Sequence, residues 1–345
     1  MKNYILLLFL TCSTLAAVAQ DNDNRTPYLT KSLANNAINS VIVNTSAGGI
    51  SVSGQSGQPP RVEVYIRGNN NRELSKEEIQ KRLNDDYDLD ITVSGHVVTA
   101  IAKSKHNFSF GRSSLSISFK IYVPQQTATD LKTSGGGIRL DNLKGNETFS
   151  TSGGGLQLDR LYGTIHGTTS GGGINVSNSG DNLNLSTSGG GITAKNCTGQ
   201  IKLVTSGGGL RLNNLKGTIN ASTSGGGVEG GNIEGELVTS TSGGGIDLVQ
   251  MACSLNAGTS AGGLHVQMKQ VGKYLKLNAS AGNIDLELPS KQGFDLDMRA
   301  DGINQTKVSS FIGKWDNEHI KGSVNGGGIP VSAYASSGNL NVRFN

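Results

Sequence analysis

Apolar residues recur at the same positions of successive 18-residue intervals between residues 133 and 278. We count each interval from the threonine that opens it, which is position 0. Position 5 is always Ile, Leu or Val, and position 7 is apolar in most intervals. Apolar residues at every second position predict a β-strand with one face turned inward. The residues at position 5 are Ile138, Leu156, Ile174, Ile192, Leu210, Val228, Ile246 and Leu264.

A second alternating segment occupies positions 14 and 16, as in Leu183 and Leu185. It runs in phase into the threonine that opens the next interval, so the threonines are predicted to point inward as well. Position 9 is often Asn and position 12 often Gly. Both residue types tolerate left-handed backbone angles, which predicts a turn between the two strands. The glycine triplet that follows each threonine predicts a second, tighter corner.

The hexapeptide Thr-Ser-Gly-Gly-Gly-(Ile/Leu/Val) opens seven consecutive intervals, and Thr-Ser-Ala-Gly-Gly-Leu opens the eighth. A fixed period near 20 residues is typical of a solenoid, whose repeats stack because none can bury its apolar face alone. The sequence therefore predicts an all-β fold, a single-stranded β-solenoid (β-helix) with 18-residue rungs. The same template recurs at residues 41–52 and 331–342, which predicts irregular capping rungs at both ends.

These patterns divide the chain into five predicted parts. The part before the central repeats contains a short helical insertion. Ser75 is expected to cap this helix, with Glu78 completing a capping box and Leu74 and Ile79 forming a hydrophobic staple. The last part contains the only tryptophan, Trp315. The parts are a signal peptide (1–19), a flexible N-terminal segment (20–37), N-terminal irregular rungs and cap with a short helical insertion (38–132), the regular 18-residue repeat solenoid (133–288), and C-terminal irregular rungs and cap (289–345).

The first residues resemble a secretory signal. Lys2 precedes an apolar run over residues 4–10, and Ala17-Val18-Ala19 forms a small-residue cleavage site. We therefore expect an exported protein (periplasmic, on the outer surface or secreted), without direct membrane insertion after signal removal, because no later run is long enough to span a bilayer. Cys12 raises the alternative of a lipoprotein, but Phe9-Leu10-Thr11 departs from the small residues that lipidation requires.

Composition and charge narrow the possible functions. The 50 glycines and 16% charged residues would suggest disorder, but the glycines recur at fixed positions. Residues 133–278 hold ten Lys/Arg and eight Asp/Glu without a basic stripe, which argues against a nucleic acid partner. Cys197 and Cys253 lie three intervals apart, on the order of 14 Å along the rod, too far for a disulfide. We expect both to be small buried hydrophobes.

No motif predicts a cofactor or a metal. The glycine triplets lack the pattern of a phosphate-binding loop, and position 6 has no column of Asp to hold calcium. Five histidines, His96, His106, His166, His265 and His319, are scattered without ligand spacing.

One pair of carboxylates could belong to a polysaccharide-active enzyme. Asp141 is predicted to lie one rung from Asp159, with Arg139 and Arg160 nearby, and two carboxylates so placed could act as acid and base. An ion-paired cluster on a solvated corner is the interpretation that we favour, so no catalysis is predicted.

The outward positions 13, 15 and 17 form the candidate binding face. Uncharged hydroxyl and amide columns could form hydrogen bonds with a glycan or a surface protein. They could equally be a soluble face that avoids charge repulsion between rungs, and the sequence leaves both alternatives open. The candidate residues are Thr164, His166, Thr168, Asn182, Asn184, Ser186, Thr218, Asn220 and Ser222.

These features together resemble the bacterial putative-adhesin β-solenoid family, which is similar to the autotransporter-adhesin head and to toast-rack domains. The resemblance rests on the signal peptide, Gly-Gly-Ile-Ser-Val at residues 48–52, Ile-Tyr-Val-Pro at 121–124, the repeats, and Ser-Gly-Asn-Leu-Asn-Val at 337–342. It implies an exported, non-catalytic adhesion or scaffold module of the cell envelope that binds through repeated polar columns. An envelope-stress sensing or regulatory module that binds a membrane partner is the alternative, and a polysaccharide-active β-helix enzyme is the third.

Overall fold

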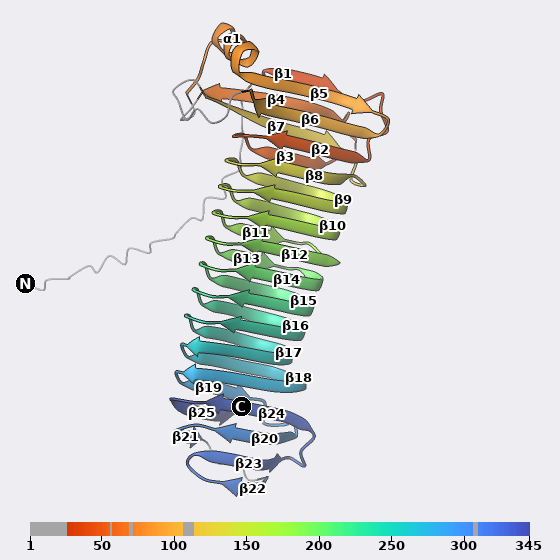
Figure 1. The fold of residues 1–345 in the computed structure, drawn as a ribbon. Helices are drawn as coiled ribbons and strands as arrows, with labels where there is room; N and C mark the ends of the chain where they lie inside the picture. The colour runs from red at the N-terminus through yellow and green to blue at the C-terminus, as the bar shows by residue number, and fades with distance from the viewer. Residues whose placement is uncertain (1–25, 56, 69–71, 106–113, 306–309) are drawn as a thin grey trace, which may run out of the picture.

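The protein forms one long rod of stacked strands (Figure 1). The computed structural model describes residues 26–55, 57–68, 72–105, 114–305 and 310–345, and these contain 25 strands and one helix. The predicted signal peptide and Cys12 lie outside the described residues. The all-β class and the solenoid-like arrangement of the chain are confirmed.

The strands fall into an N-terminal, a central and a C-terminal group. The N-terminal group holds β1 (Leu29–Ser32), β2 (Ser40–Thr45), β3 (Ile50–Gly54), β4 (Arg61–Gly68), α1 (Lys76–Asp86), β5 (Tyr87–Ser94), β6 (Val97–Ser104) and β7 (Leu115–Val123). The central group holds β8 (Ala128–Thr133), β9 (Ile138–Thr151), β10 (Leu156–Thr169), β11 (Ile174–Ser177), β12 (Asn182–Thr187), β13 (Ile192–Lys195), β14 (Thr198–Thr205), β15 (Leu210–Thr223), β16 (Val228–Thr241), β17 (Ile246–Ala261), β18 (Leu264–Ala281) and β19 (Ile284–Leu288). The C-terminal group holds β20 (Phe294–Arg299), β21 (Gly302–Gln305), β22 (Phe311–Trp315), β23 (His319–Val324), β24 (Ile329–Ala335) and β25 (Asn339–Phe344).

Neighbouring rungs pair in parallel, and through most of the rod each residue lies opposite the one 18 positions further on. Leu156 pairs with Ile138 on one side and with Ile174 on the other. The offset is retained as far as Ile246 and Leu264. Leu264, however, pairs with Ile284, so the last interval contains 20 residues, and the β17–β18 pairing has register shifts. The prediction of regular 18-residue spacing to residue 288 is therefore wrong in its last interval, where the two extra residues are accommodated as bulges.

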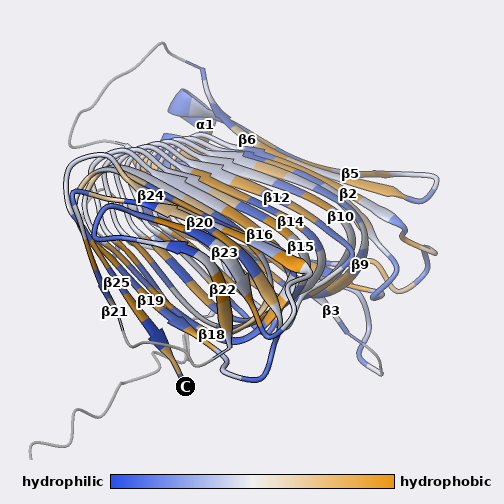
Figure 2. Cartoon of the chain, turned by 90° about the horizontal axis from the view of Figure 1, so that it is seen from below, coloured by the Kyte–Doolittle hydropathy of each residue, from blue (hydrophilic) through white to orange (hydrophobic). Residues whose placement is uncertain are grey.

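The inward side chains form a continuous apolar core between two walls of strands, which superpose as a flattened coil when the rod is seen along its axis (Figure 2). Cys197 and Cys253 lie in this core as free thiols, as predicted, with 0% and 1% exposure. Burial raises the pKa of both thiols, that of Cys253 to about 12, so neither is a reactive thiolate at neutral pH.

The buried threonines join each rung to the one before it. Thr151 Oγ1 donates to the carbonyl oxygen of Gly136 at 2.7 Å and accepts a hydrogen bond from the N–H of Gly154 at 3.3 Å. Both contacts recur at Thr169, Thr187, Thr205, Thr223 and Thr241, and Thr259 repeats the first. A buried hydroxyl is stabilising only when its hydrogen bonds are made, and this corner makes them within the backbone of two rungs.

The direct stacking of these corners also explains why the middle residue of each triplet is glycine. A Cβ on Gly154 would lie 2.1 Å from the carbonyl oxygen of Gly136, because the two corners stack directly. A Cβ on the first glycine, Gly153, would meet nothing closer than 3.5 Å. The chain varies accordingly, since Ala47 and Ala261 occupy the first place while the middle place is Gly in every rung of the rod that has this corner.

The opposite corner has left-handed backbone angles at position 9, as predicted from its asparagines. The φ values of Asn178, Asn196 and Asn214 lie between 51° and 55°. Their amides form a ladder, in which Asn196 Nδ2 donates to Asn178 Oδ1 at 3.1 Å and Asn214 Nδ2 donates to Asn196 Oδ1 at 3.0 Å. Arg160 and Gln250 occupy the same column with φ of 52° and 56°, so two residues there adopt this conformation without being asparagine.

The order of rungs along the rod differs from their order in the sequence at both ends. Strands β2 and β3 lie between β6 and β7 on one side and β8 and β9 on the other. At the other end, β24 lies between β18 and β20, and β25 lies between β19 and β21. The first and last rungs of the sequence are therefore enclosed within the rod, and the segments between them and the central repeats form the tips.

The N-terminal tip corrects one predicted boundary. Residues 29–32, predicted to belong to a flexible segment, form β1, which pairs antiparallel with β4. The strand is held because Leu33 is fully buried and Lys31 Nζ donates to the Ile91 carbonyl oxygen of β5. Helix α1 covers this tip (Figure 1). Ser75 Oγ accepts from the N–H of Glu78, as predicted, while the Glu78 carboxylate pairs with Arg82.

Candidate functional site

The nine predicted binding residues lie on one wall of the rod, in strands β10, β12 and β15. Thr164, His166 and Thr168 pair with Asn182, Asn184 and Ser186 of the next rung. The third row, Thr218, Asn220 and Ser222, is not adjacent to these two, because the rung containing β14 lies between them. We call the outward residues at positions 13, 15 and 17 of β10, β12, β14 and β15 the hydroxyl–amide face.

Sequence reasoning missed the β14 row of this face. Gln200, Lys202 and Val204 occupy the same three columns as the predicted residues. The 18-residue spacing alone places these residues in the three columns. Only Gln200, however, has the hydroxyl or amide chemistry by which the other rows were chosen. The face therefore carries one positive charge at Lys202, in its third rung.

The polar groups of this face are not used inside the protein. Among the described residues, none of the nine predicted side chains forms a hydrogen bond to another protein group. The threonines of the corner and the asparagines of position 9 contrast with them, because both bond between rungs. Donors and acceptors of the hydroxyl–amide face therefore point to solvent, at a repeat of about 4.8 Å along the rod.

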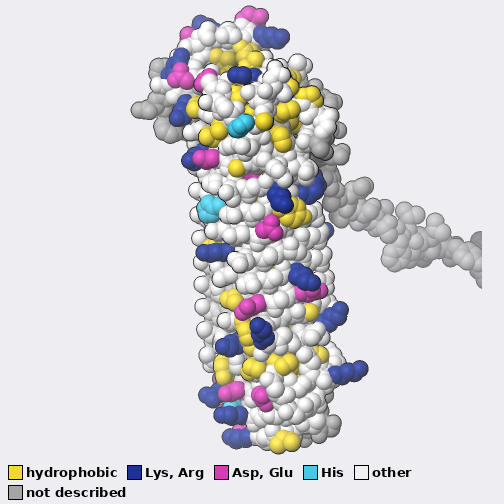
Figure 3. All heavy atoms as spheres, turned by 90° about the vertical axis from the view of Figure 1, so that its right-hand side faces the viewer, with side chains coloured by type: hydrophobic (Ala, Val, Ile, Leu, Met, Phe, Trp, Pro, Cys, Tyr) yellow, Lys and Arg dark blue, Asp and Glu magenta, His cyan; other side chains and the backbone are white. Residues whose placement is uncertain are grey.

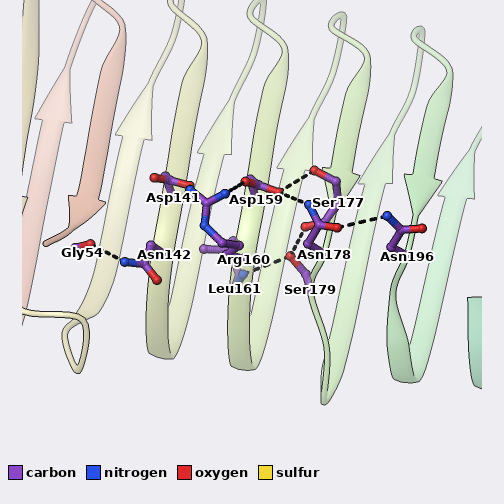
Figure 4. Close-up of polar contacts among 10 residues, drawn as sticks. All are labelled: Gly54, Asp141, Asn142, Asp159, Arg160, Leu161, Ser177, Asn178, Ser179 and Asn196. Carbon is purple, nitrogen blue, oxygen red and sulfur yellow. Dashed lines mark hydrogen bonds and ion pairs between the residues drawn. The ribbon is translucent and has the colours of Figure 1, made fainter. Parts of the chain in front are cut away.

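The predicted carboxylate pair is brought together, but around an arginine (Figure 4). Arg160 Nη2 lies 2.5 Å from Asp141 Oδ1, and its Nη1 pairs with Asp159 Oδ2. The other Asp159 oxygen accepts from Ser177 Oγ at 2.7 Å and from Asn178 Nδ2 at 2.8 Å. Partial burial acts to raise the pKa of Asp159, yet these hydrogen bonds and the arginine charge outweigh it and lower that pKa. A carboxyl held ionised in this way is poorly suited to donate a proton as a general acid.

Arg139 lies beside this cluster and bonds Gln157 Oε1 at 3.4 Å. Arg160 has a second consequence, since it occupies position 9 and replaces an asparagine of the ladder. Its guanidinium bridges two rungs in place of the amide. The cluster is therefore part of the corner that joins the walls.

On the face of the rod drawn in Figure 3, charged side chains are dispersed along its length. Apolar side chains gather on this face toward the N-terminal end. Within the described residues no group of His, Cys, Asp and Glu is arranged to hold a metal ion. His166 is exposed on the hydroxyl–amide face and His265 on the opposite wall, while His106 lies outside the described residues. His319 contacts Asp297 at 3.3 Å and His96 contacts the Ala37 carbonyl oxygen at 2.7 Å.

A shallow groove of about 450 Å³ lies on the opposite wall. It is lined by glycines of the tight corner together with Thr193, Arg211 and Glu229. Arg211 and Glu229 form an exposed ion pair across it at 3.0 Å. Two charges that neutralise each other in solvent leave the groove little electrostatic preference for a charged ligand.

The stacked strands, the flattened core and the enclosed terminal rungs define an elongated β-solenoid-like module. The chain matches the family Toastrack DUF4097 over residues 38–343 and belongs to that family. This match confirms the resemblance to toast-rack domains.

Two solved structures are similar to this chain. One is a putative cell adhesion protein from Clostridium sporogenes, 12% identical, with a TM-score of 0.20, covering 92% of this chain and 98% of that one. The other is a putative adhesin from Parabacteroides merdae, 15% identical, with a TM-score of 0.44, covering 70% of this chain and 95% of that one. No curated protein matches the chain. Where the structure describes the chain, its helix is too short and too polar to cross a membrane.

Proposed function

We propose that this protein is an exported, non-catalytic adhesion or scaffold module of the cell envelope that binds through the hydroxyl–amide face. The observation that carries the proposal is that the nine predicted side chains form no hydrogen bonds within the described protein while the rungs hold them in fixed columns. A glycan or a surface protein with repeated polar groups is the proposed partner.

The rod supports repeated weak contacts. The rows of β10, β12 and β15 each offer two or three hydroxyl or amide groups, and the β14 row offers one, that of Gln200. A single such hydrogen bond contributes only about 0.5–1.5 kcal/mol. Rows held on a rigid scaffold engage an already bound partner at high effective concentration, so their contributions combine without a deep pocket.

The carboxylate cluster supports a role without catalysis. Asp141 and Asp159 share Arg160, and the lowered pKa of Asp159 leaves it without an available proton. Retention of any glycan-cleaving activity after Asp141→Asn and Asp159→Asn would remove this pair as a catalytic centre.

A binding experiment tests the proposal. Mature chain lacking residues 1–19 is applied to an array of glycans and matrix proteins, beside the triple variant Asn182→Ala, Asn184→Ala and Asn220→Ala. Loss of three amide contacts should weaken binding at least about tenfold. The matched control, Asn175→Ala, Thr193→Ala and Asn213→Ala, changes outward polar residues of the opposite wall and should bind like the unmodified chain.

Equal weakening by both triple variants would show that this face is not the binding surface. An array without any ligand, together with co-purification of an inner-membrane protein, would instead support the envelope-stress module. Circular dichroism of each variant establishes that the rod is intact.

A further inference from the structure

The two tips of the rod end in different ways. At the N-terminal tip, edge strand β5 carries Asp88 and Asp90 on its outer face, α1 packs beside it, and Lys31 bonds its Ile91 carbonyl oxygen. Charged side chains and a covering helix are the usual means of preventing a strand edge from pairing with another chain. Strand β5 is therefore shielded, while the second edge strand of this tip, β1, has four residues and pairs only with β4 among the described strands.

The C-terminal tip ends in β22. This strand pairs antiparallel with β23 on one side, and no described strand pairs with its other side. Ile312, at the middle of the strand, is 79% exposed, the highest value among the exposed large hydrophobic residues of the described chain. An open backbone edge that carries an exposed aliphatic side chain is a template for strand pairing.

The aromatic residues of β22 are also incompletely partnered. Phe311 and Trp315 stack edge to face with ring centroids 4.4 Å apart, and both are only partly buried against the last layer of the core. The Trp315 indole Nε1 is buried without a hydrogen-bond partner among the described atoms. A buried N–H without an acceptor is uncommon in a complete structure.

We propose that β22 is a self-association site, through which two copies of this protein pair antiparallel, C-terminal tip to C-terminal tip. The chemistry of the strand is nearly symmetric about Gly313: aromatic, aliphatic, glycine, lysine with an aliphatic stem, aromatic. Antiparallel pairing centred on Gly313 places Ile312 opposite Lys314 of the second copy and Phe311 opposite Trp315. No like charges face each other directly, and Lys314 is neutralised by Asp316 of its own chain at 2.8 Å.

The symmetry also limits the assembly to two copies. Antiparallel pairing of identical strands is isologous, so it uses both open edges and closes. The product is a rod of twice the length, which presents two copies of the hydroxyl–amide face, although the proposal does not depend on that face binding a ligand.

Sedimentation and small-angle X-ray scattering of the mature chain, up to protein concentrations on the order of 100 µM, test the proposal, since a five-residue strand interface is small and weak. We expect a concentration-dependent dimer whose maximum dimension is about twice that of the monomer. Ile312→Asp should abolish it. Ile42→Asp, which adds the same charge at an exposed isoleucine on the flank of the rod, should leave it unchanged.

Disulfide trapping tests the register. Directly opposed residues of antiparallel strands lie close enough for a disulfide. Ile312→Cys mixed with Lys314→Cys should therefore cross-link efficiently under mild oxidation, and Ile312→Cys alone should not. A monomer at every concentration, a dimer of unchanged length, or a dimer that survives Ile312→Asp would overturn the proposal.

Discussion

At the residue scale, the stacking of identical corners decides which glycines are required. The triplet looks uniform in the sequence, yet its three members differ in the space around them. Gly154 stacks on the carbonyl of Gly136, whereas a Cβ on Gly153 would make only ordinary van der Waals contacts, the nearest at 3.5 Å. The requirement comes from the neighbouring rung, because the backbone itself fills the place of a side chain.

Gly154→Ala should destabilise the rod by at least about 2 kcal/mol, because a methyl group 2.1 Å from a backbone oxygen forces two rungs apart. Gly153→Ala is the matched control and should change stability by less than about 1 kcal/mol, since alanine occupies that place elsewhere in the chain. Urea unfolding of both variants measures the difference. Equal midpoints would contradict the steric explanation.

Glu147 is the second informative residue. It occupies position 14, where the rungs that follow place aliphatic side chains, and it is fully buried. Thr129 Oγ1 donates to one of its oxygens at 2.5 Å, while the other oxygen has no partner among the described atoms. Burial raises the pKa of Glu147 to about 7, and the hydrogen bond from Thr129 offsets only part of that rise.

The raised pKa makes stability depend on pH. Below about pH 4.5 the carboxyl is protonated in both the folded and the unfolded chain, so it imposes no penalty. Between about pH 4.5 and 7 the unfolded chain releases the proton first, and the free energy of unfolding falls as pH rises, by up to about 3 kcal/mol. Glu147→Gln should abolish this loss and raise stability at pH 8, with little effect at pH 4.

Thermal unfolding across pH 4–8 checks this prediction. Glu229→Gln serves as the control, because Glu229 lies in an exposed ion pair and its removal should leave the pH profile nearly unchanged. A Glu147→Gln profile that still falls between pH 4.5 and 7 would show that another group is responsible.

At the element scale, pattern and structure agree where each rung repeats its neighbour. Even in the irregular N-terminal part, the runs that alternate apolar and polar residues at 62–66, 89–93 and 115–123 lie in β4, β5 and β7. The position 9 turn was predicted because asparagine tolerates the left-handed angle, and the structure adds that the stacked asparagine amides bond from rung to rung. Arg160 was predicted near the carboxylates, but not as a member of that column, since arginine has no intrinsic preference for a positive φ.

A large inward side chain in one rung is also compensated by a small residue in the adjacent rung. Phe149 at position 16 lies against Gly167 at the same position of the next rung, where a Cβ would come within 2.1 Å of the ring. The large residue fills the space that the glycine leaves, so the core remains continuous. An alternation pattern marks both positions as inward, but only their stacking shows why one is phenylalanine and the other glycine.

At the scale of the whole molecule, enclosing the terminal rungs couples segments that are distant in the sequence. The last rung, β24 and β25, is held on one side by the regular solenoid and on the other by β20 and β21. The C-terminal tip therefore rests on the final residues of the chain, although it precedes them in sequence.

Deleting residues 327–345 should expose the tip strands β20–β23 to exchange with solvent. Hydrogen exchange measured by mass spectrometry should show at least a tenfold loss of protection there, because β20 and β21 lose their parallel partners. Replacing residues 310–324 with a short Gly-Ser linker is the control, and β24 and β25 should stay protected, since they still pair with β18 and β19. Retained protection of β20 after the terminal deletion would contradict the enclosed arrangement.

The sequence by itself determined the strands, the inward columns, the asparagine corner and the composition of the hydroxyl–amide face, because each follows from spacing within one rung or between equal rungs. The tertiary structure alone decided the order of rungs at the ends, the ordering of β1, the sharing of Arg160 by two carboxylates and the burial of Glu147 beside Thr129. These depend on which strand lies beside which, and the energy of pairing segments distant in sequence is set by the assembled neighbours rather than by any local pattern.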